Sequence, residues 1–124
     1  MITKIFEQTV PIDDNNFILS SDIINTQQIQ SDSIECISSH SYFTVIFLRD
    51  RRSIKTRNSL KEWEKYLAGS NFLRVNRTTI INLDLVKHIE KGTDQKHIIH
   101  MQNYENPVIM SKNYIAKLKS DFSK

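Results

Sequence analysis

One stretch near the middle of the chain restricts the fold more than any other. Residues 42–48 read YFTVIFL, a run of aromatic and β-branched side chains with apolar groups at both odd and even positions. Successive side chains of a strand point to opposite faces, so a strand that is apolar on both faces has to be covered on both sides. We therefore expect residues 42–48 to form a buried strand at the centre of the structure.

The segments that follow this strand predict a hairpin and a short helix. A charged turn at residues 49–52 leads into residues 53–57, SIKTR, where the side chains alternate strictly between two faces. Ser59 and Glu62 have the spacing of a capping box, in which each side chain bonds to the other residue's backbone N–H at a helix start. One apolar face of the helix then consists of Leu60, Trp63 and Leu67.

The rest of the chain predicts a mostly β fold. Short β-like segments are separated by polar turns, at residues 17–19, 23–29, 34–37, 97–101 and 107–110. By composition, residues 38–41 (SSHS) are expected to form a loop. Ser111 is expected to cap a C-terminal helix whose apolar face holds Ile115, Leu118 and Phe122. Strands and helices do not alternate as they do in doubly wound folds.

The length of 124 residues corresponds to one domain. A polar, turn-rich cluster at residues 11–16 predicts a boundary between a lead-in, residues 1–16, and the main domain, residues 17–124. The lead-in either adds an edge strand or stays loose. No apolar run is long enough for a membrane span, and the N-terminus does not resemble a signal peptide. A single cysteine, Cys36, excludes an internal disulfide and fits a reducing cytoplasm.

Positive charge is concentrated in one part of the sequence. Residues 1–35 carry a net charge of −5, whereas residues 49–77 hold nine Lys or Arg and three acidic residues, a balance of +6. A local field of this sign attracts polyanions, of which nucleic acid is the commonest in the cytoplasm. A basic surface exposed only to solvent explains the same charge pattern equally well.

Catalytic and metal-binding patterns are not found. His97 and His100 point to opposite faces of a predicted strand, and Cys36 has no partner cysteine, so we expect no metal site. Ser38, Ser39 and His40 lie near Cys36 without a nucleophile motif, so we expect neither an enzyme nor a cofactor. Only one helix is predicted before Ser111, which excludes a helix-turn-helix. If this chain binds DNA, it has to do so from loops between strands.

Residues 72–82, FLRVNRTTIIN, are the most informative segment for function. No apolar stripe recurs at helical spacing, so the segment reads as two short strands joined by an exposed polar turn at residues 76–79. An arginine on such a turn, Arg77, is a rigidly aimed planar donor that suits a phosphate group or a guanine edge. On residue type alone, an ordinary surface charge is the favoured explanation of Arg77.

The pattern F-x-R-V-x-R-[ST]-x-I-[VI]-N within this segment resembles the central signature of the LytTR family. LytTR is the DNA-binding domain of LytR/AlgR-type bacterial transcription regulators. Residues 59–63 (SLKEW) and 108–112 (VIMSK) resemble the flanking signatures of the family in the expected order. The resemblance covers roughly residues 17–122. It implies an elongated β-sandwich of stacked antiparallel sheets with one or two short helices, which inserts loop side chains into successive major grooves.

The resemblance implies contacts at Arg77, at Lys112 and in the loop at residues 40–43, and the charge and position of other side chains add further candidates. For bases or grooves these are Arg77, Lys112, His40, Asn76 and Tyr42. For phosphates they are Arg74, Lys55, Arg57, Thr78 and Ser111. Position 76 is usually histidine in the family and position 112 usually arginine; lysine lacks the planar two-point contact, so we expect weaker base preference there. The implied partner is double-stranded DNA, as direct-repeat promoter sites, bound by a monomer or a weak homodimer.

Three functions remain open from the sequence. The leading one is a cytoplasmic transcription regulator that binds specific duplex DNA. In response regulators of two-component systems a receiver domain precedes the LytTR domain, and residues 1–16 cannot form one, so this chain is either a stand-alone regulator or a fragment. The second function is a protein-interaction module that pairs with another regulator. The third is an RNA-binding β-domain that stacks bases on Tyr42 and Phe43.

Overall fold

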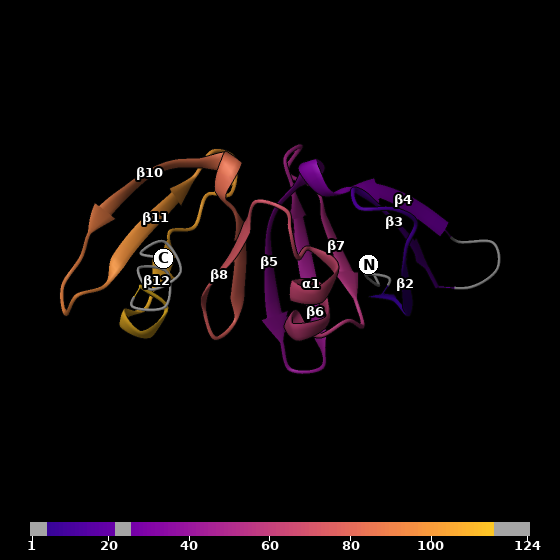
Figure 1. Ribbon diagram of the computed structural model, residues 1–124, viewed down its shortest axis with the longest axis horizontal. Coiled ribbons are helices and arrows are strands. Elements are labelled where there is room, and N and C mark those ends of the chain that lie inside the picture. Colours follow the sequence, from indigo (N-terminus) through magenta and orange to yellow (C-terminus); the bar gives the residue numbers. More distant parts are fainter. Residues whose placement is uncertain (1–4, 22–25, 116–124) are drawn as a thin grey trace.

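Three β-sheets lie side by side along the long axis of the molecule in a computed structural model that describes residues 5–21 and 26–115 (Figure 1). The central sheet has six strands in the order β1-β7-β6-β5-β9-β8. These strands are β1 (Ile5–Phe6), β5 (Ile34–His40), β6 (Phe43–Leu48), β7 (Ser53–Thr56), β8 (Phe72–Asn76) and β9 (Thr79–Asn82). All neighbours are antiparallel except β1 and β7, which run parallel.

A three-stranded antiparallel sheet flanks the central sheet on each side. The N-terminal sheet consists of β2 (Gln8–Pro11), β3 (Asn16–Ser20) and β4 (Thr26–Gln30). The C-terminal sheet consists of β10 (Val86–Lys91), β11 (His97–Met101) and β12 (Val108–Met110). Short 3-10 turns, η1 (Ser31–Ser33) and η2 (Leu83–Leu85), connect these sheets to the central one. The expected fold of stacked, mostly antiparallel sheets with short helices is confirmed.

The central strand predicted at residues 42–48 is β6, which lies between β7 and β5. Its consecutive residues Thr44, Val45 and Ile46 are all buried, so both faces of the strand are covered as expected. On one face, Ile46 belongs to a core that β3, β4 and the helix α1 (Leu60–Tyr66) share with the central sheet. On the other face, the central sheet and the C-terminal sheet form a second core around Val75, Ile81 and Ile99.

The helix α1 begins as its sequence predicts. The hydroxyl of Ser59 accepts a hydrogen bond from the backbone N–H of Glu62, whose carboxylate accepts one from the N–H of Ser59, which completes the capping box. Trp63 is fully buried, and its indole N–H donates to the hydroxyl of Thr44 at 3.1 Å. A helix of seven residues is unstable alone. Its attachment to the central sheet through Trp63 therefore holds it in place.

The prediction of a loop at residues 38–41 is wrong for residues 38–40. Strand β5 continues to His40, and the turn to β6 lies at Ser41 and Tyr42. Ser38 pairs with Val45 of β6 on one side and with Thr79 of β9 on the other. Backbone hydrogen bonds to two neighbours therefore keep the segment extended, although serine has little intrinsic preference for strands.

The segment before the predicted boundary contributes two edge strands. β1 pairs with β7, and β2 pairs with β3 along four residue pairs from Gln8↔Ser20 to Pro11↔Phe17. The polar cluster between β2 and β3 forms a turn in which Asp13 accepts a hydrogen bond from the N–H of Asn15. Of the two alternatives for this stretch, the edge strand is therefore the one observed. The division of the chain at residue 16 stays a prediction.

Candidate nucleic-acid interface

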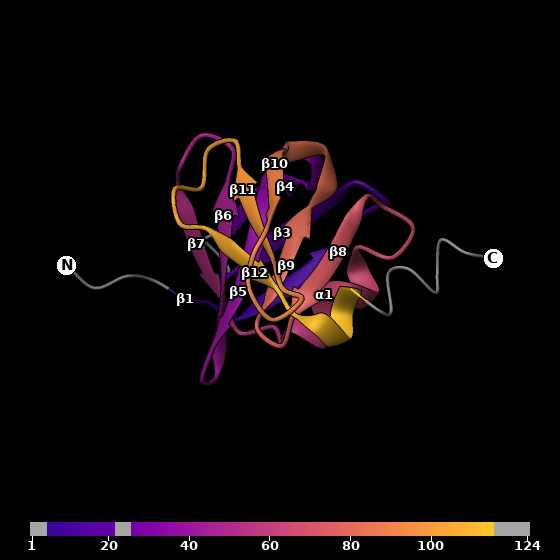
Figure 2. The same cartoon turned by 90° about the vertical axis from the view of Figure 1, so that its left-hand side faces the viewer.

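Three predicted contact segments lie along one edge of the molecule, the lower edge in Figures 1 and 2. They are the β5–β6 turn at residues 41–42, the β8–β9 turn at residues 77–78, and the helical turn at residues 112–115 that follows β12. Residues 77 and 112 are both exposed. The two side chains that the resemblance implies as base readers are thus on neighbouring turns of the same edge rather than on opposite surfaces.

The β8–β9 turn is held from within by Arg74. Its guanidinium donates to the backbone carbonyl of Arg77 at 2.6 Å and to that of Asn76 at 3.3 Å. It also forms an ion pair with Glu64 of α1 at 2.7 Å, and both side chains are partly buried. With these partners, the Arg74 guanidinium stabilises the turn. Arg77, in contrast, forms no ion pair among the described residues. A phosphate contact by Arg74 stays a prediction.

Asn76 connects the same turn to the C-terminal sheet. Its side-chain amide donates to the backbone carbonyl of Ile109 at 2.8 Å, and its side-chain oxygen accepts from the N–H and the hydroxyl of Thr78 at 2.9 and 3.1 Å. Both polar atoms of the Asn76 side chain are therefore engaged within the protein. The predicted DNA contacts of Asn76 and Thr78 stay predictions, and any such contact has to share or replace these bonds.

Lys112 is aimed by the end of β12. The backbone N–H of Ser111 donates to the carbonyl of Val75 at 3.1 Å, so the chain leaves β12 directly beside β8. The helical turn then begins after Ser111, whose carbonyl accepts from the N–H groups of Tyr114 and Ile115. The helix predicted here is confirmed for residues 112–115, and Ile115 packs against the second core. Leu118 and Phe122, predicted on the same face, lie outside the described residues.

The third predicted segment presents aromatic side chains. Tyr42 is 68% exposed, and the guanidinium carbon of Arg57 lies 5.1 Å from its ring centre. The ring of His40 stacks on Phe43 at 5.6 Å, and its Nε2 lies 2.9 Å from the hydroxyl of Ser38. Lys55, predicted to contact phosphate, has its ammonium 5.0 Å above the Phe43 ring.

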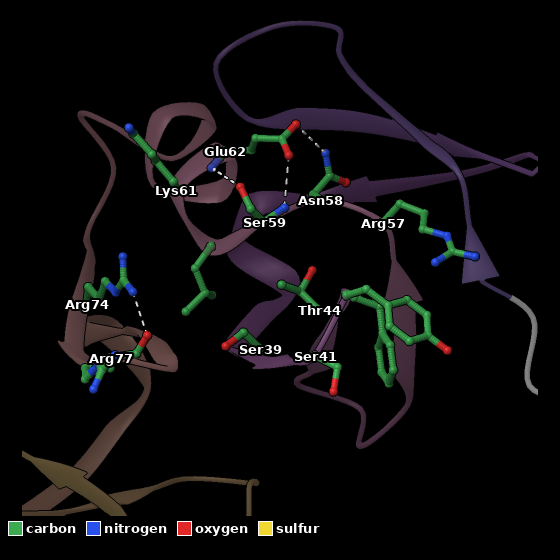
Figure 3. A pocket seen from close by; sticks show the side chains of 13 residues that line it. Ser39, Ser41, Thr44, Arg57, Asn58, Ser59, Lys61, Glu62, Arg74 and Arg77 are labelled. Carbon is green, nitrogen blue, oxygen red and sulfur yellow. Dashed lines mark hydrogen bonds between the residues drawn. The ribbon is translucent and has the colours of Figure 1, made fainter.

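A hollow of about 380 Å³ separates this aromatic turn from the Arg77 turn (Figure 3). Figure 3 shows Arg57 on one side, Arg74 and Arg77 on the opposite side, and the start of α1 above. Its cationic side chains are Arg57, Lys61, Arg74 and Arg77. Its other polar side chains include Ser39, Ser41, Asn58, Ser59 and Glu62.

Two acidic groups reduce the positive charge of this hollow. Glu7 forms an ion pair with Arg57 at 3.1 Å. Hydrogen bonds from the backbone N–H of Ser59 and from Asn58 lower the pKa of Glu62, so this carboxylate stays ionised. Among the cations of the hollow, Arg57 is thus paired with Glu7, and Arg74 is paired with Glu64 of α1. Lys61 and Arg77 form no ion pair with any residue in the described part of the chain.

Most of the chain resembles known proteins. The LytTr DNA-binding domain family matches residues 24–123. This protein belongs to the LytTR family. A solved structure, the LytTr DNA-binding domain of a protein described as a methyl-accepting/DNA response regulator from Bacillus cereus, has the same fold with a TM-score of 0.73 and 18% identity. That match covers 89% of this chain and 98% of the other. The search of curated proteins finds no match.

Family membership confirms the resemblance and the class of function. LytTR domains bind double-stranded DNA and serve in transcription regulation, and LytTR is not an enzyme family. The part of this LytTR domain at residues 5–21 and 26–115 contains no group of three or more His, Cys, Asp or Glu side chains placed to hold a metal ion. Within the same residues, no helix is both long enough and apolar enough to span a membrane.

Lys61 of this LytTR domain is a further candidate that was not predicted from the sequence. It lies in the first turn of α1, is exposed, and lines the hollow. The capping box and the apolar positions of the helix were sufficient to orient it, because Leu60 and Trp63 face the core and leave position 61 toward solvent. Pairing between distant strands decides which side chains of the β5–β6 turn line this hollow. The local sequence pattern therefore does not predict them.

Proposed function

We propose that this LytTR domain binds specific duplex DNA, with direct-repeat promoter sites as targets, and so regulates transcription from the bacterial cytoplasm. The observation that carries the proposal is the placement of Arg77 and Lys112 on adjacent turns of one edge. Two hydrogen bonds join these turns. The side-chain amide of Asn76 donates to the carbonyl of Ile109, and the backbone N–H of Ser111 donates to the carbonyl of Val75. Because both turns are tied, their spacing is a fixed property of the fold rather than an outcome of binding.

Arg77 is the principal base reader in this proposal. Its exposed guanidinium projects from a turn whose backbone Arg74 holds in place, so little backbone conformational entropy is lost when it binds. A bidentate contact to guanine O6 and N7 discriminates against other bases by roughly 1–3 kcal/mol. Lys112 contacts the neighbouring stretch of the duplex through a single ammonium group. Because an ammonium group lacks the planar pair of donors of arginine, we expect a weaker base preference there.

The hollow between the β5–β6 turn and the Arg77 turn suits the phosphate backbone. Backbone contacts position a protein on DNA without carrying sequence information. Arg57 and Lys61 approach the hollow from two sides, and the hydroxyls of Ser39 and Ser59 are further donors. Tyr42 lines the hollow on the side of the β5–β6 turn. Together with His40, at the end of β5, it provides a third contact that supports the register of the domain on the duplex.

Selection of binding sites from a random duplex library, at one stated salt concentration, is the experiment that tests this function. An enriched site supports it, and fluorescence anisotropy then compares that site with a scrambled duplex. Arg77→Ala should weaken binding to the selected site by about 5- to 150-fold and binding to the scrambled duplex far less. Arg49→Ala, an exposed arginine in the β6–β7 turn at the opposite edge, serves as the matched control. Equal losses on both duplexes would show that Arg77 does not read bases.

A protein-interaction module remains the second candidate, and one feature favours it. The side chains of Val10, Ile12 and Ile18 are 54, 50 and 37% exposed, on and beside the edge strand β2. Exposed apolar groups of this kind occur where partners bind. If the library yields no enriched duplex, and a partner regulator binds wild type but not Val10→Ser, this candidate replaces the first. Stronger binding to single-stranded RNA than to any duplex would instead indicate base stacking on Tyr42.

A further inference from the structure

Glu35 is a fully buried carboxylate that the DNA-binding proposal does not use. Its oxygens accept hydrogen bonds from the backbone N–H of Asn103 at 2.7 Å, from the side-chain amide of Asn103 at 2.9 Å, and from the backbone N–H of Tyr104. No lysine or arginine in residues 5–21 and 26–115 forms an ion pair with it. A buried charge is costly unless it is hydrogen-bonded, so these donors are what make its burial tolerable.

The position of Glu35 in its strand explains how it reaches these donors. The pairing of β5 with β6 changes register between Ile34 and Cys36, which places Glu35 at a β-bulge. A bulge re-aims the side chain of a residue that would otherwise follow the alternation of the strand. Glu35 therefore turns toward residues 103 and 104, which follow β11 in the C-terminal sheet. Beside this contact, Phe47 packs on Tyr104 with ring centres 4.7 Å apart.

Besides the second core that the central and C-terminal sheets share, two hydrogen-bonded links join them, at opposite edges of the molecule. The Glu35 link lies where β5 begins and β11 ends, at the upper edge of Figure 1. The other link, through Asn76 and Ser111, lies at the lower edge beside the candidate interface. If the two sheets were linked at one edge alone, the angle between them could still change about that edge. Links at both edges fix this angle.

We propose that Glu35 is a positioning residue that sets the angle of the C-terminal sheet, and through it the direction in which Lys112 projects relative to Arg77. The expected effect on DNA binding rests on the proposed function. The expected effect on the angle of the C-terminal sheet rests only on the two links. Glu35→Gln keeps one acceptor oxygen for the two backbone N–H groups, but it removes the negative charge and turns an NH₂ group toward the amide of Asn103, so it weakens the link and changes the volume little. Arg77, on the central sheet, keeps its direction in this variant. Lys112 stays beside the Arg77 turn through the lower link but changes its direction with the C-terminal sheet.

The DNA experiment compares base preferences along the selected site. Selections with Arg77→Ala and Lys112→Ala first assign the positions that each side chain reads. Glu35→Gln should then keep the preferences assigned to Arg77 and flatten those assigned to Lys112. A uniform loss over both groups of positions would show a general loss of folded protein and overturn the proposal. Asp32→Asn removes an exposed carboxylate close by in the chain and controls for the change in charge.

A second measurement needs no DNA. Spin labels at Lys65→Cys on α1 and Lys87→Cys on β10, both exposed positions, report the distance between the two sheets by pulsed electron resonance. Cys36 is buried and stays unlabelled. Glu35→Gln should broaden the distance distribution, and Asn103→Ala, which keeps both backbone donors, should broaden it less. If Glu35→Gln does not fold, Glu35→Asp decides, because it keeps the charge but withdraws both oxygens from residues 103 and 104 by one methylene: a distribution as narrow as that of wild type overturns the proposal. This result stands even if no duplex is ever selected.

Discussion

The side-chain amide of Asn76 donates to the backbone carbonyl of Ile109 across the boundary between two sheets, at 2.8 Å. Asn76 precedes Arg77 and Ile109 lies three residues before Lys112, so one hydrogen bond lies close to both proposed base readers. The LytTR signature usually has histidine at this position. In this protein the asparagine both closes the Arg77 turn and holds the C-terminal sheet against it.

Asn76→Ala should therefore lower both stability and specific DNA binding. It removes three side-chain hydrogen bonds and leaves the carbonyl of Ile109 without this donor, so we expect a loss of about 1–3 kcal/mol in the free energy of unfolding, measured by urea titration. Asn76→Asp keeps the acceptor for Thr78 but turns a charged oxygen toward the carbonyl of Ile109, so it tests the contact with Ile109 alone and should also lower the free energy of unfolding. Unfolding curves that coincide for Asn76→Ala and wild type would show that these bonds contribute nothing.

Lys61→Ala should change the salt dependence of DNA binding. If Lys61 neutralises one phosphate in the hollow, its removal should reduce the slope of log K against log salt by about 1, with little change in sequence preference. Lys65 is also exposed on α1 but does not line the hollow, so Lys65→Ala is the matched control. Identical slopes for the two variants would remove Lys61 from the interface.

The thiol of Cys36 should be unreactive in the folded protein. Burial, with a smaller contribution from neighbouring Glu35, raises the pKa of this thiol to about 12. At pH 8 only about one molecule in ten thousand carries the reactive thiolate, and burial also blocks access of the reagent. Maleimide labelling in increasing urea should therefore follow the unfolding curve. Lys65→Cys, labelled without denaturant, provides the positive control, and rapid modification of native wild type would contradict the assignment.

The capping box of α1 should add an acid-sensitive component to stability. The pKa of Glu62 is lowered in the folded state, chiefly by the hydrogen bond from the N–H of Ser59, so the ionised form is the one that stabilises the fold. This stabilisation is present above the unfolded pKa of about 4.3 and is lost as the pH falls through the lower folded value. The difference in unfolding free energy between wild type and Glu62→Gln should thus shrink below about pH 4.

Ser59→Ala tests the other half of the same capping box. Loss of an N-cap hydroxyl should lower the free energy of unfolding by about 1 kcal/mol at neutral pH. Because a hydroxyl does not titrate in this range, the loss should persist at low pH, unlike the contribution of Glu62. A pH-independent difference for Glu62→Gln would show that its charge plays no part in the cap.

Features that depend on neighbouring residues were predicted correctly from the sequence. The apolar pattern of residues 42–48 identified the central strand, and the spacing of Ser59 and Glu62 identified the start of α1. The hairpin at residues 72–82 and its exposed turn followed from the change of pattern within one short segment. These features require only side-chain periodicity and hydrogen bonds between residues a few positions apart, so they are encoded locally.

The extent of β5 depended on distant partners. Ser38, Ser39 and His40 have the composition of a loop, yet pairing with β6 and β9 keeps them extended. The engagement of Arg74 with Glu64 was equally hidden, since it depends on how α1 packs beside the β8–β9 turn. No local pattern distinguishes an arginine that supports a turn from one that is free to bind phosphate.

The sequence by itself thus determined the central strand, the capped helix, the exposed Arg77 turn and the family. Only the tertiary structure decided which polar groups remain available for DNA and how the sheets are joined. Glu35 shows the physical reason: its partners lie 68 and 69 residues further along the chain, and a bulge re-aims its side chain toward them. Contacts of that separation form only when the whole chain packs, so neither periodicity nor residue type reveals them.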